Sequence, residues 1–292
     1  DDTKYRMFPN VDPSEEIENP FWIINRNVLT DKNKRITGAV TANLDLTSWL
    51  NVSYRMGIDS YNNNGYTYIA PGGNVKSIYQ NGRLSKSDVS YDYWTSNLMA
   101  NAHKTFGDFD FNLLVGTTAE STTRVNNTRW GWDFVTAGTI SFGNIIDENK
   151  KFTERTTRKR LVGVYGEFRA AYKNIAYLTV TGRNDWSSTL PKANNSYFYP
   201  SVSGSFVFTE LLPKNNVLTF GKLRASWARV GKDAGPYATN TYLWDAQVVN
   251  GNFVGIGNSW TGGSPYLVPE IQTSWEVGTE LKFFNGLLGI DW

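Results

Sequence analysis

The chain has 292 residues, a formal net charge of +2 and no cysteine. This charge gives no argument for a nucleic-acid partner, and the missing cysteine excludes disulfides and thiolate metal sites. A membrane-spanning helix is excluded too, because no run of about 18 apolar residues occurs. Aromatic residues make up 15% of the chain, a share that fits membrane-interface girdles or a sugar-binding surface.

The first predicted strand covers residues 36–46 and alternates apolar with polar side chains. Ile36, Val40 and Leu44 fall on one face, and Asp45 falls on the other. A period of two indicates a β-strand with one apolar and one polar face. The strand is longer than the usual five or six residues or so, and a tilted strand of about this length crosses a bilayer in a closed barrel.

Nine further strands are predicted on the same grounds, at 50–61, 94–106, 109–122, 160–172, 175–186, 197–208, 218–230, 271–283 and 287 onward. The segments between strands alternate in length: 47–49 and 107–108 are short, whereas 62–93 and 123–159 are long. Hairpin turn chemistry occupies three of the short segments, at Gly107-Asp108, Lys173-Asn174 and Asn285-Gly286. Outer-membrane barrels have short turns at one end and long loops at the other. The sequence therefore predicts an all-β fold, part of a large antiparallel transmembrane β-barrel.

Charged side chains keep to the polar parity of these strands, and the few exceptions, Lys104, Arg160 and Arg229, lie near strand ends. We interpret seven of them as candidates to line a wet lumen: Arg55, Asp59, Glu167, Arg169, Arg183, Asp185 and Glu276. A charge at mid-depth on the apolar parity would cost about 2–4 kcal/mol, which explains the sorting. Cross-strand pairing and contact with a plug are alternative roles for these charges, and the sequence leaves the choice open.

The long predicted loops are rich in aromatic residues. Six of them are candidate extracellular contacts to a ligand or a partner: Tyr68, Trp130, Trp132, Tyr237, Trp244 and Trp260. Flat aromatic faces stack on sugar rings, and they also bury well against a protein. Packing at the membrane rim is the alternative, and one sequence does not separate these readings.

No catalytic, cofactor-binding or metal site is predicted. His103 is the only histidine, so neither a transition-metal site nor a His-based nucleophile triad is expected. The chain has no phosphate-binding loop, dinucleotide fingerprint or nucleophile elbow. We therefore expect a protein that performs no bond chemistry.

Several strings resemble one family in their order and spacing, and together they cover nearly the whole chain. They are Asn19-Pro20-Phe21-Trp22, Arg183-Asn184-Asp185-Trp186-Ser187-Ser188-Thr189-Leu190-Pro191, Tyr197-Phe198-Tyr199-Pro200-Ser201, Lys222-Leu223-Arg224-Ala225-Ser226 and Glu276-Val277-Gly278-Thr279-Glu280. This pattern resembles the barrel of SusC/RagA-type TonB-dependent outer-membrane transporters. Phe21 departs from it, because Tyr is usual at that place in the family.

The resemblance implies a plugged barrel of about 22 strands, of which the ten predicted here are under half. On this interpretation residues 1–292 are part of one TonB-dependent-receptor β-barrel domain, and residues 1–35 form an extracellular loop segment that enters the first strand. The plug and the TonB-contact segment are absent from the sequence. The chain starts without Met and ends within an apolar alternation at Trp292, so we expect a longer protein.

The resemblance also implies the function. We expect an active, multi-pass transporter in the outer membrane of a Gram-negative cell, in contact with outer-membrane lipid. It would import oligosaccharides or oligopeptides that a SusD-like surface lipoprotein delivers, with energy supplied through TonB. No cofactor and no nucleic acid are expected.

Two alternatives remain open at this point. One is a soluble all-β carbohydrate-binding domain, whose apolar faces would have to pack on each other. The other is an outer-membrane receptor or adhesin barrel that does not transport. Val164, Leu178 and Trp275 test the first alternative, because a soluble domain would bury them against a second sheet.

Overall fold

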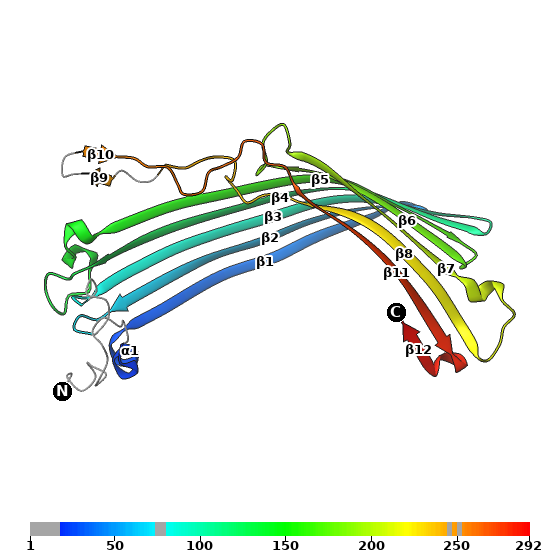
Figure 1. Cartoon of the computed structure of the whole chain (residues 1–292), viewed down its shortest axis with the longest axis horizontal. Coiled ribbons are helices and arrows are strands. Elements are labelled where there is room, and N and C mark those ends of the chain that lie inside the picture. Colours follow the sequence, from blue (N-terminus) through cyan, green and yellow to red (C-terminus); the bar gives the residue numbers. More distant parts are fainter. Residues whose placement is uncertain (1–17, 74–79, 244–246, 250–252) are drawn as a thin grey trace. The chain divides into compact units, whose positions relative to one another are not determined.

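The computed structural model describes residues 18–73, 80–243, 247–249 and 253–292. Within these residues the chain forms a ten-stranded sheet with the strand order β1-β2-β3-β4-β5-β6-β7-β8-β11-β12 (Figure 1). Consecutive strands of the sheet are therefore neighbours, and the antiparallel pair β9–β10 comes between β8 and β11 in the sequence. Every pairing with a described register, from β5 to β12, is antiparallel.

The elements have these bounds: α1 (Pro20–Arg26), β1 (Val28–Thr47), β2 (Leu50–Ile69), β3 (Arg83–Phe106), β4 (Phe109–Trp132), β5 (Lys151–Tyr172), β6 (Ala176–Ser187), β7 (Ser196–Val207), β8 (Leu218–Lys232), β9 (Gln247–Val249), β10 (Phe253–Gly255), β11 (Glu270–Phe283) and β12 (Leu288–Asp291). Among the described residues, four short 3₁₀ helices lie between strands: η3 (Phe142–Asn144), η4 (Asp147–Asn149), η5 (Phe208–Leu211) and η6 (Phe284–Gly286).

All ten predicted strands are present, but the prediction was wrong about where β1 to β5 meet the long connections. β2 continues to Ile69 and β4 to Trp132, well past the predicted ends at 61 and 122. Tyr68, Trp130 and Trp132 therefore lie in strands and not in loops. β1 begins at Val28, so the predicted loop segment 1–35 is also wrong for residues 28–35.

The reason lies in the side chains of the missed extensions. On β2 the parity that carries Met56 and Ile58 goes on with Ser60, Asn62 and Asn64. Both faces of the strand are polar there, so the period-two signal disappears while the backbone pairing continues. A prediction that relies on alternation ends the strand at that point.

The predicted hairpin turns are confirmed by their backbone conformation. Lys173 and Asn174 both have positive φ, at 47° and 59°, as the two central residues of a type I′ turn require, and the Ile175 N–H donates to the Tyr172 carbonyl at 2.8 Å. Gly107 has φ 58°, and Asn285 and Gly286 have φ 56° and 88°. Asn and Gly adopt this left-handed region at little cost, which explains why the chain carries them at these short turns.

The string Asn19-Pro20-Phe21-Trp22 forms the start of α1. The side chain of Asn19 accepts a hydrogen bond from the backbone N–H of Phe21 at 2.9 Å, and Pro20 occupies the first helical position. Trp22 is buried, with 4% of its surface exposed. Just after the helix, the side-chain oxygen of Asn27 accepts from the backbone N–H of Ala70 at 3.0 Å. This segment is thereby attached to the end of β2.

The described chain divides into two compact units. One contains the described residues up to 38 together with 58–93 and 122–158, and the other contains 39–57, 94–121 and 159–292. In the second unit the apolar face of the sheet is exposed: Val164 is 51%, Leu178 44% and Trp275 79% accessible. The only other sheet among the described residues pairs β9 with β10. The apolar faces are therefore not packed against a second sheet. The soluble alternative requires such packing, so the structure contradicts it.

No helix in the described parts of the chain combines the length and the apolar character that crossing a bilayer demands.

Candidate functional site

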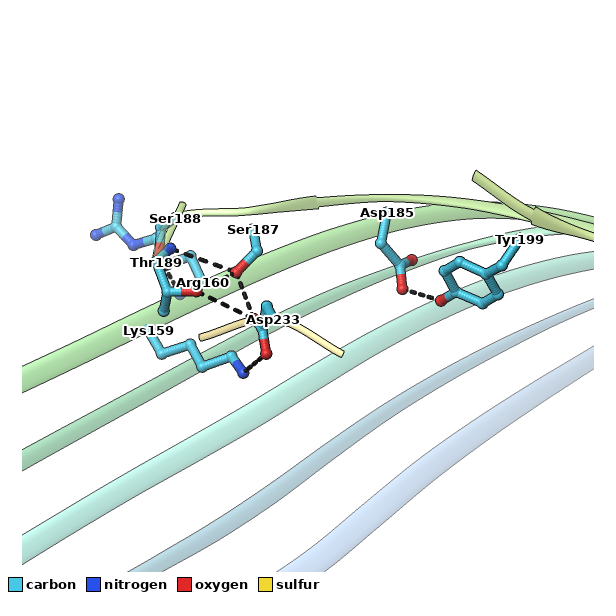
Figure 2. Close-up of polar contacts among 8 residues, drawn as sticks. All are labelled: Lys159, Arg160, Asp185, Ser187, Ser188, Thr189, Tyr199 and Asp233. Atoms are coloured by element: carbon cyan, nitrogen blue, oxygen red, sulfur yellow. Dashed lines mark hydrogen bonds and ion pairs between the residues drawn. The ribbon is translucent and has the colours of Figure 1, made fainter. Parts of the chain in front are cut away.

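The polar face of β6 and β7 carries a cluster of Arg183, Asp185 and Tyr199. Arg183 Nε donates to Asp185 Oδ1 at 2.8 Å and to the Tyr199 hydroxyl at 2.9 Å, and that hydroxyl donates to Asp185 Oδ2 (Figure 2). Arg183 and Tyr199 are directly opposed in the β6–β7 register. Only 6% of the Asp185 side chain is exposed, so these partners offset a desolvation cost that an unpaired carboxylate would bear in full.

Two glycines make room for this cluster. Gly163 of β5 opposes Asp185 in the register, and a Cβ there would lie 2.3 Å from Asp185 Oδ1 and 2.4 Å from Arg183 Nη2. The ring of Tyr165 lies under the guanidinium, with its centroid 5.3 Å from Arg183 Cζ. Gly116 of β4 leaves space for that ring, because a Cβ there would be 2.5 Å from it. The guanidinium of Arg183 is therefore packed between Gly163 and the ring of Tyr165 in addition to its polar contacts.

Other predicted lumen-lining charges in this unit also have close partners. Arg169 Nε contacts Glu167 Oε1 at 2.7 Å on β5. Glu276 of β11 lies 3.8 Å from Arg224 of β8, whose Nη2 also contacts Asp291 at 2.9 Å. These charges therefore pair with one another, and the wet lumen that they are predicted to line stays a prediction. Contact with a ligand stays a prediction.

In the first unit, Asp59 of β2 binds Arg35 of β1 through two hydrogen bonds of 2.7 and 2.6 Å. This bidentate pair joins neighbouring strands on their polar parity. Arg55 is exposed on β2, in the second unit. His103, the only histidine of the sequence, lies in the second unit too, with its Nε2 2.7 Å from Asp110 Oδ2.

A second polar cluster surrounds the carboxylate of Asp233, directly after β8 (Figure 2). Lys159 Nζ lies 2.7 Å from Asp233 Oδ1. The hydroxyls of Ser187 and Thr189 donate to Oδ2 at 2.5 and 3.2 Å. Ser187 and Thr189 are 1% and 3% exposed, so this carboxylate is bound in a largely dry environment. Burial opposes its ionisation, but the hydrogen bonds from Lys159 and Ser187 outweigh burial and hold the pKa of Asp233 below its usual value.

The sequence analysis missed this second cluster. Ser187 and Thr189 belong to the string that carries the resemblance, so a signal was present, but their partner Asp233 is 46 residues from Ser187 along the chain. The adjacent Ser188 is occupied as well: its hydroxyl accepts from the backbone N–H of Arg160 at 2.8 Å. Alternation and spacing contain no information about a contact of this range.

Two of the predicted aromatic contacts form a stack on β4. The rings of Trp130 and Trp132 have centroids 5.3 Å apart and an interplanar angle of 26°, as the shared parity of alternate strand residues allows. Arg83 of β3 adds a cation–π contact, with Cζ 5.4 Å from the Trp130 ring. Tyr68 lies on β2, and its ring centroid is 6.0 Å from that of Phe134.

The connection from β4 to β5, residues 133–150, packs on the opposite parity of β4. Ile145 is only 2% exposed, and a Cβ on Gly131 would lie 3.1 Å from it. Arg129 Cζ lies 5.6 Å from the Phe142 ring. Gly131 and Arg129 alternate with Trp130 and Trp132 along the strand, so these contacts of the connection lie on the parity opposite to that of the two tryptophans.

The remaining predicted contacts lie between β8 and β11. The Tyr242 hydroxyl donates to the backbone carbonyl of Tyr237 at 3.2 Å. Trp260 is 92% exposed. Trp244 lies outside the residues that the structure describes. The structure thus brings Trp130 and Trp132 together, and it leaves the ligand contacts of all six aromatic residues as predictions.

Comparison with known proteins gives a consistent result. A family model described as TonB dependent receptor-like, beta-barrel matches residues 2–292. A TonB-dependent receptor P26 from Formosa agariphila is 33% identical over 131 residues, which are 44% of this chain and 13% of that protein.

Solved structures have the same fold. A chain of the RagAB peptide transporter matches with a TM-score of 0.83 at 17% identity, over 94% of this chain and 30% of that chain. The siderophore receptor PiuA from Acinetobacter baumannii matches with a TM-score of 0.52 at 14% identity, over 89% of this chain and 39% of that chain. The chain thus spans less than half the length of these proteins. It belongs to the TonB-dependent receptor-like β-barrel family, which is a family of outer-membrane proteins.

Proposed function

We propose that this chain forms part of the barrel wall of a SusC/RagA-type active importer in the outer membrane of a Gram-negative cell. The observation that carries the proposal is the fold, which matches the RagAB peptide transporter over 94% of the chain with a TM-score of 0.83. The strings around Asp185 and Tyr199 support the same choice within the wider receptor family.

The two faces of the sheet support a position in a membrane wall. In the second unit one face exposes large apolar side chains such as Val164, Leu178 and Leu223, and lipid would cover them. The other face carries Arg183, Asp185 and Arg224 with their partners, and a wet lumen or a plug would meet them. A barrel wall separates its side chains in this way.

For the substrate we propose an oligosaccharide or an oligopeptide, delivered by a SusD-like surface lipoprotein. RagAB, whose fold this chain shares, is a peptide transporter, which favours peptides. The aromatic stack of Trp130 and Trp132 and the exposed Trp260 suit either substrate, or a protein partner. Energy would come through TonB, which the protein would contact through regions outside this chain.

Uptake experiments test the proposal. The gene for the full protein is deleted, and growth and uptake are measured with single oligopeptides and oligosaccharides as the limiting nutrient. Loss of uptake of one substrate class, with the same loss in a strain that lacks TonB, is expected. Uptake of every candidate substrate at the rate of the parent strain would refute the importer.

A receptor or adhesin barrel without transport is the second candidate, because exposed aromatic residues between β8 and β11 would also serve binding alone. It predicts that whole cells bind the ligand equally well with and without TonB. It further predicts that no labelled ligand reaches the periplasm. The importer predicts accumulation there only when TonB is active.

A further inference from the structure

The backbone pairing of β7 with β8 ends before either strand ends. The register runs from Ser201 opposite Ala228 to Val207 opposite Lys222. β7 nevertheless starts at Ser196, where it pairs with β6, and β8 continues to Lys232, where it pairs with β11. Pro200, next to the last rung, has no N–H with which to extend the ladder. Residues 196–200 and 229–232, all of them described, thus face each other across a seam without ladder bonds.

Side chains bridge this seam instead. Tyr197, on the β7 side, is only 8% exposed, and its ring lies against Gly231 of β8, where a Cβ would be 2.7 Å from it. Asn194 Nδ2 donates to the backbone carbonyl of Leu267 at 3.2 Å. This bond attaches the returning end of the segment 233–269 to the β6–β7 connection.

Asp233 contacts three side chains at this seam. It directly follows β8, and 10% of its side chain is exposed. One carboxylate oxygen receives Lys159 of β5, and the other receives the hydroxyls of Ser187 and Thr189 from the end of β6 (Figure 2). A buried carboxylate that loses its cation and both hydroxyl donors is strongly destabilised unless water hydrates it. The carboxylate therefore resists any movement of β8 away from β6.

We propose that Asp233, Lys159, Ser187 and Thr189 form a clasp that holds this seam closed. While the clasp is intact, the β6–β7 connection remains in contact with the ends of β8 and β11 and with the neighbouring residues Asp233 and Leu267. When the clasp is released, these ends separate from that connection while the rungs from Ser201 to Val207 remain paired. On this proposal, the string Trp186-Ser187-Ser188-Thr189 supplies hydroxyl donors to the carboxylate of Asp233, which is distant along the chain.

Hydrogen–deuterium exchange on the full-length protein in detergent tests the clasp directly and does not depend on substrate uptake. For Asp233→Ala we expect the backbone amides of residues 229–232, 267–268 and 270–271 to exchange at least tenfold faster, and residues 222–228 to be unchanged. Asp147→Asn is the matched control. It removes the 2.5 Å ion pair with Lys150 in another connection, so residues 229–232 should keep their exchange rate.

A charge exchange separates the clasp from general damage. Asp233→Lys alone places two cations together and should open the seam. Asp233→Lys combined with Lys159→Asp restores an ion pair between the same positions and should return exchange toward the wild-type rate. Heat-dependent mobility in gel electrophoresis shows which variants still have a folded barrel.

Two results would overturn the clasp. One is a folded Asp233→Ala protein whose residues 229–232 exchange at the wild-type rate. The other is a double variant that exchanges as fast as Asp233→Lys alone. If Asp233→Ala does not fold, Asp233→Asn, which keeps the shape of the side chain and removes its charge, decides in its place by the same criterion.

Discussion

The strand β3 has the same backbone structure in both units, yet its side chains follow different rules in each. In the second unit its outward parity carries Trp94, Leu98 and Ala100, and the first two are 42% and 47% exposed. In the first unit the same parity carries Asp88 and Asp92. A single strand can therefore alternate along one part and be polar on both faces along another. Alternation reports which solvent bathes a face, and it is not a property of the strand itself.

Polar cross-strand contacts occupy this parity in the first unit. Ser60 of β2 donates to Asp92 of β3 at 2.6 Å, and Asn64 donates to Asp88 at 2.7 Å. Hydrogen-bonded pairs of this kind are typical of a sheet region in which both faces are exposed to water. We infer that the lipid-covered part of the sheet ends where the apolar parity ends, near Ile58 on β2 and Trp94 on β3.

A charge on the outward parity should separate the two regions most clearly. Val164→Arg places a charge on the face that we assign to lipid, and it should lower the free energy of unfolding by about 2–4 kcal/mol. Asn62→Arg, on the outward parity of β2 in the first unit, should change it by no more than about 0.5 kcal/mol. Urea unfolding of the full protein in lipid vesicles measures both. Equal losses for the two variants would contradict the assignment.

Glycine substitutions compare the packing of the two regions. A Cβ on Gly163 would lie 2.3 Å from Asp185 Oδ1, and a Cβ on Gly65 would lie 2.4 Å from Ser87 Oγ. Asp185 is fixed by Arg183 and Tyr199, so Gly163→Ala should cost about 1–3 kcal/mol of unfolding free energy. A serine hydroxyl moves by rotation about one bond, so Gly65→Ala should cost less.

The same unfolding experiment measures both glycine variants. A larger loss for Gly65→Ala would show that the Arg183–Asp185–Tyr199 cluster is not the rigid element of the polar face.

Acid should act on the second unit through Asp233. Its pKa is lowered in the folded protein, since the bonds from Lys159 and Ser187 outweigh burial. The stabilisation it contributes is therefore complete above the ordinary pKa of an aspartate and is lost as the pH falls through the lowered folded value. Lys159 of β5 and Tyr197 of β7 are the other titratable groups that act on this carboxylate. Amide exchange at residues 229–232 should accelerate over that acidic range.

In the Asp233→Asn variant the acceleration should be absent, because no carboxylate is left to titrate. The exposed Asp147 of the first unit is a contrasting case. A hydrogen bond from Lys150 lowers its pKa, but the pair is open to water, so Asp147→Asn should leave the thermal midpoint unchanged. An acid response at residues 229–232 that persists in Asp233→Asn would assign it to another group.

Much of the fold was predictable because it depends on local rules. Alternation located all ten strands, and turn chemistry at Gly107, Lys173-Asn174 and Asn285-Gly286 located three short turns. Parity also placed Arg183 and Asp185 on one face, where they contact each other. The ends of β1 to β5 at the long connections were not predictable in this way, because these outer parts have two polar faces and no alternation.

The sequence by itself determined the family, the presence of ten strands and the separation of apolar from polar faces, since each depends on neighbours along the chain or on a period of two. Only the tertiary structure decided which polar residues bind one another. Asp233 meets Lys159 and Ser187 across 74 and 46 residues, and Pro200 leaves unpaired the seam that they bridge. Such contacts depend on the lateral register of four strands, which the pattern of any one strand does not contain.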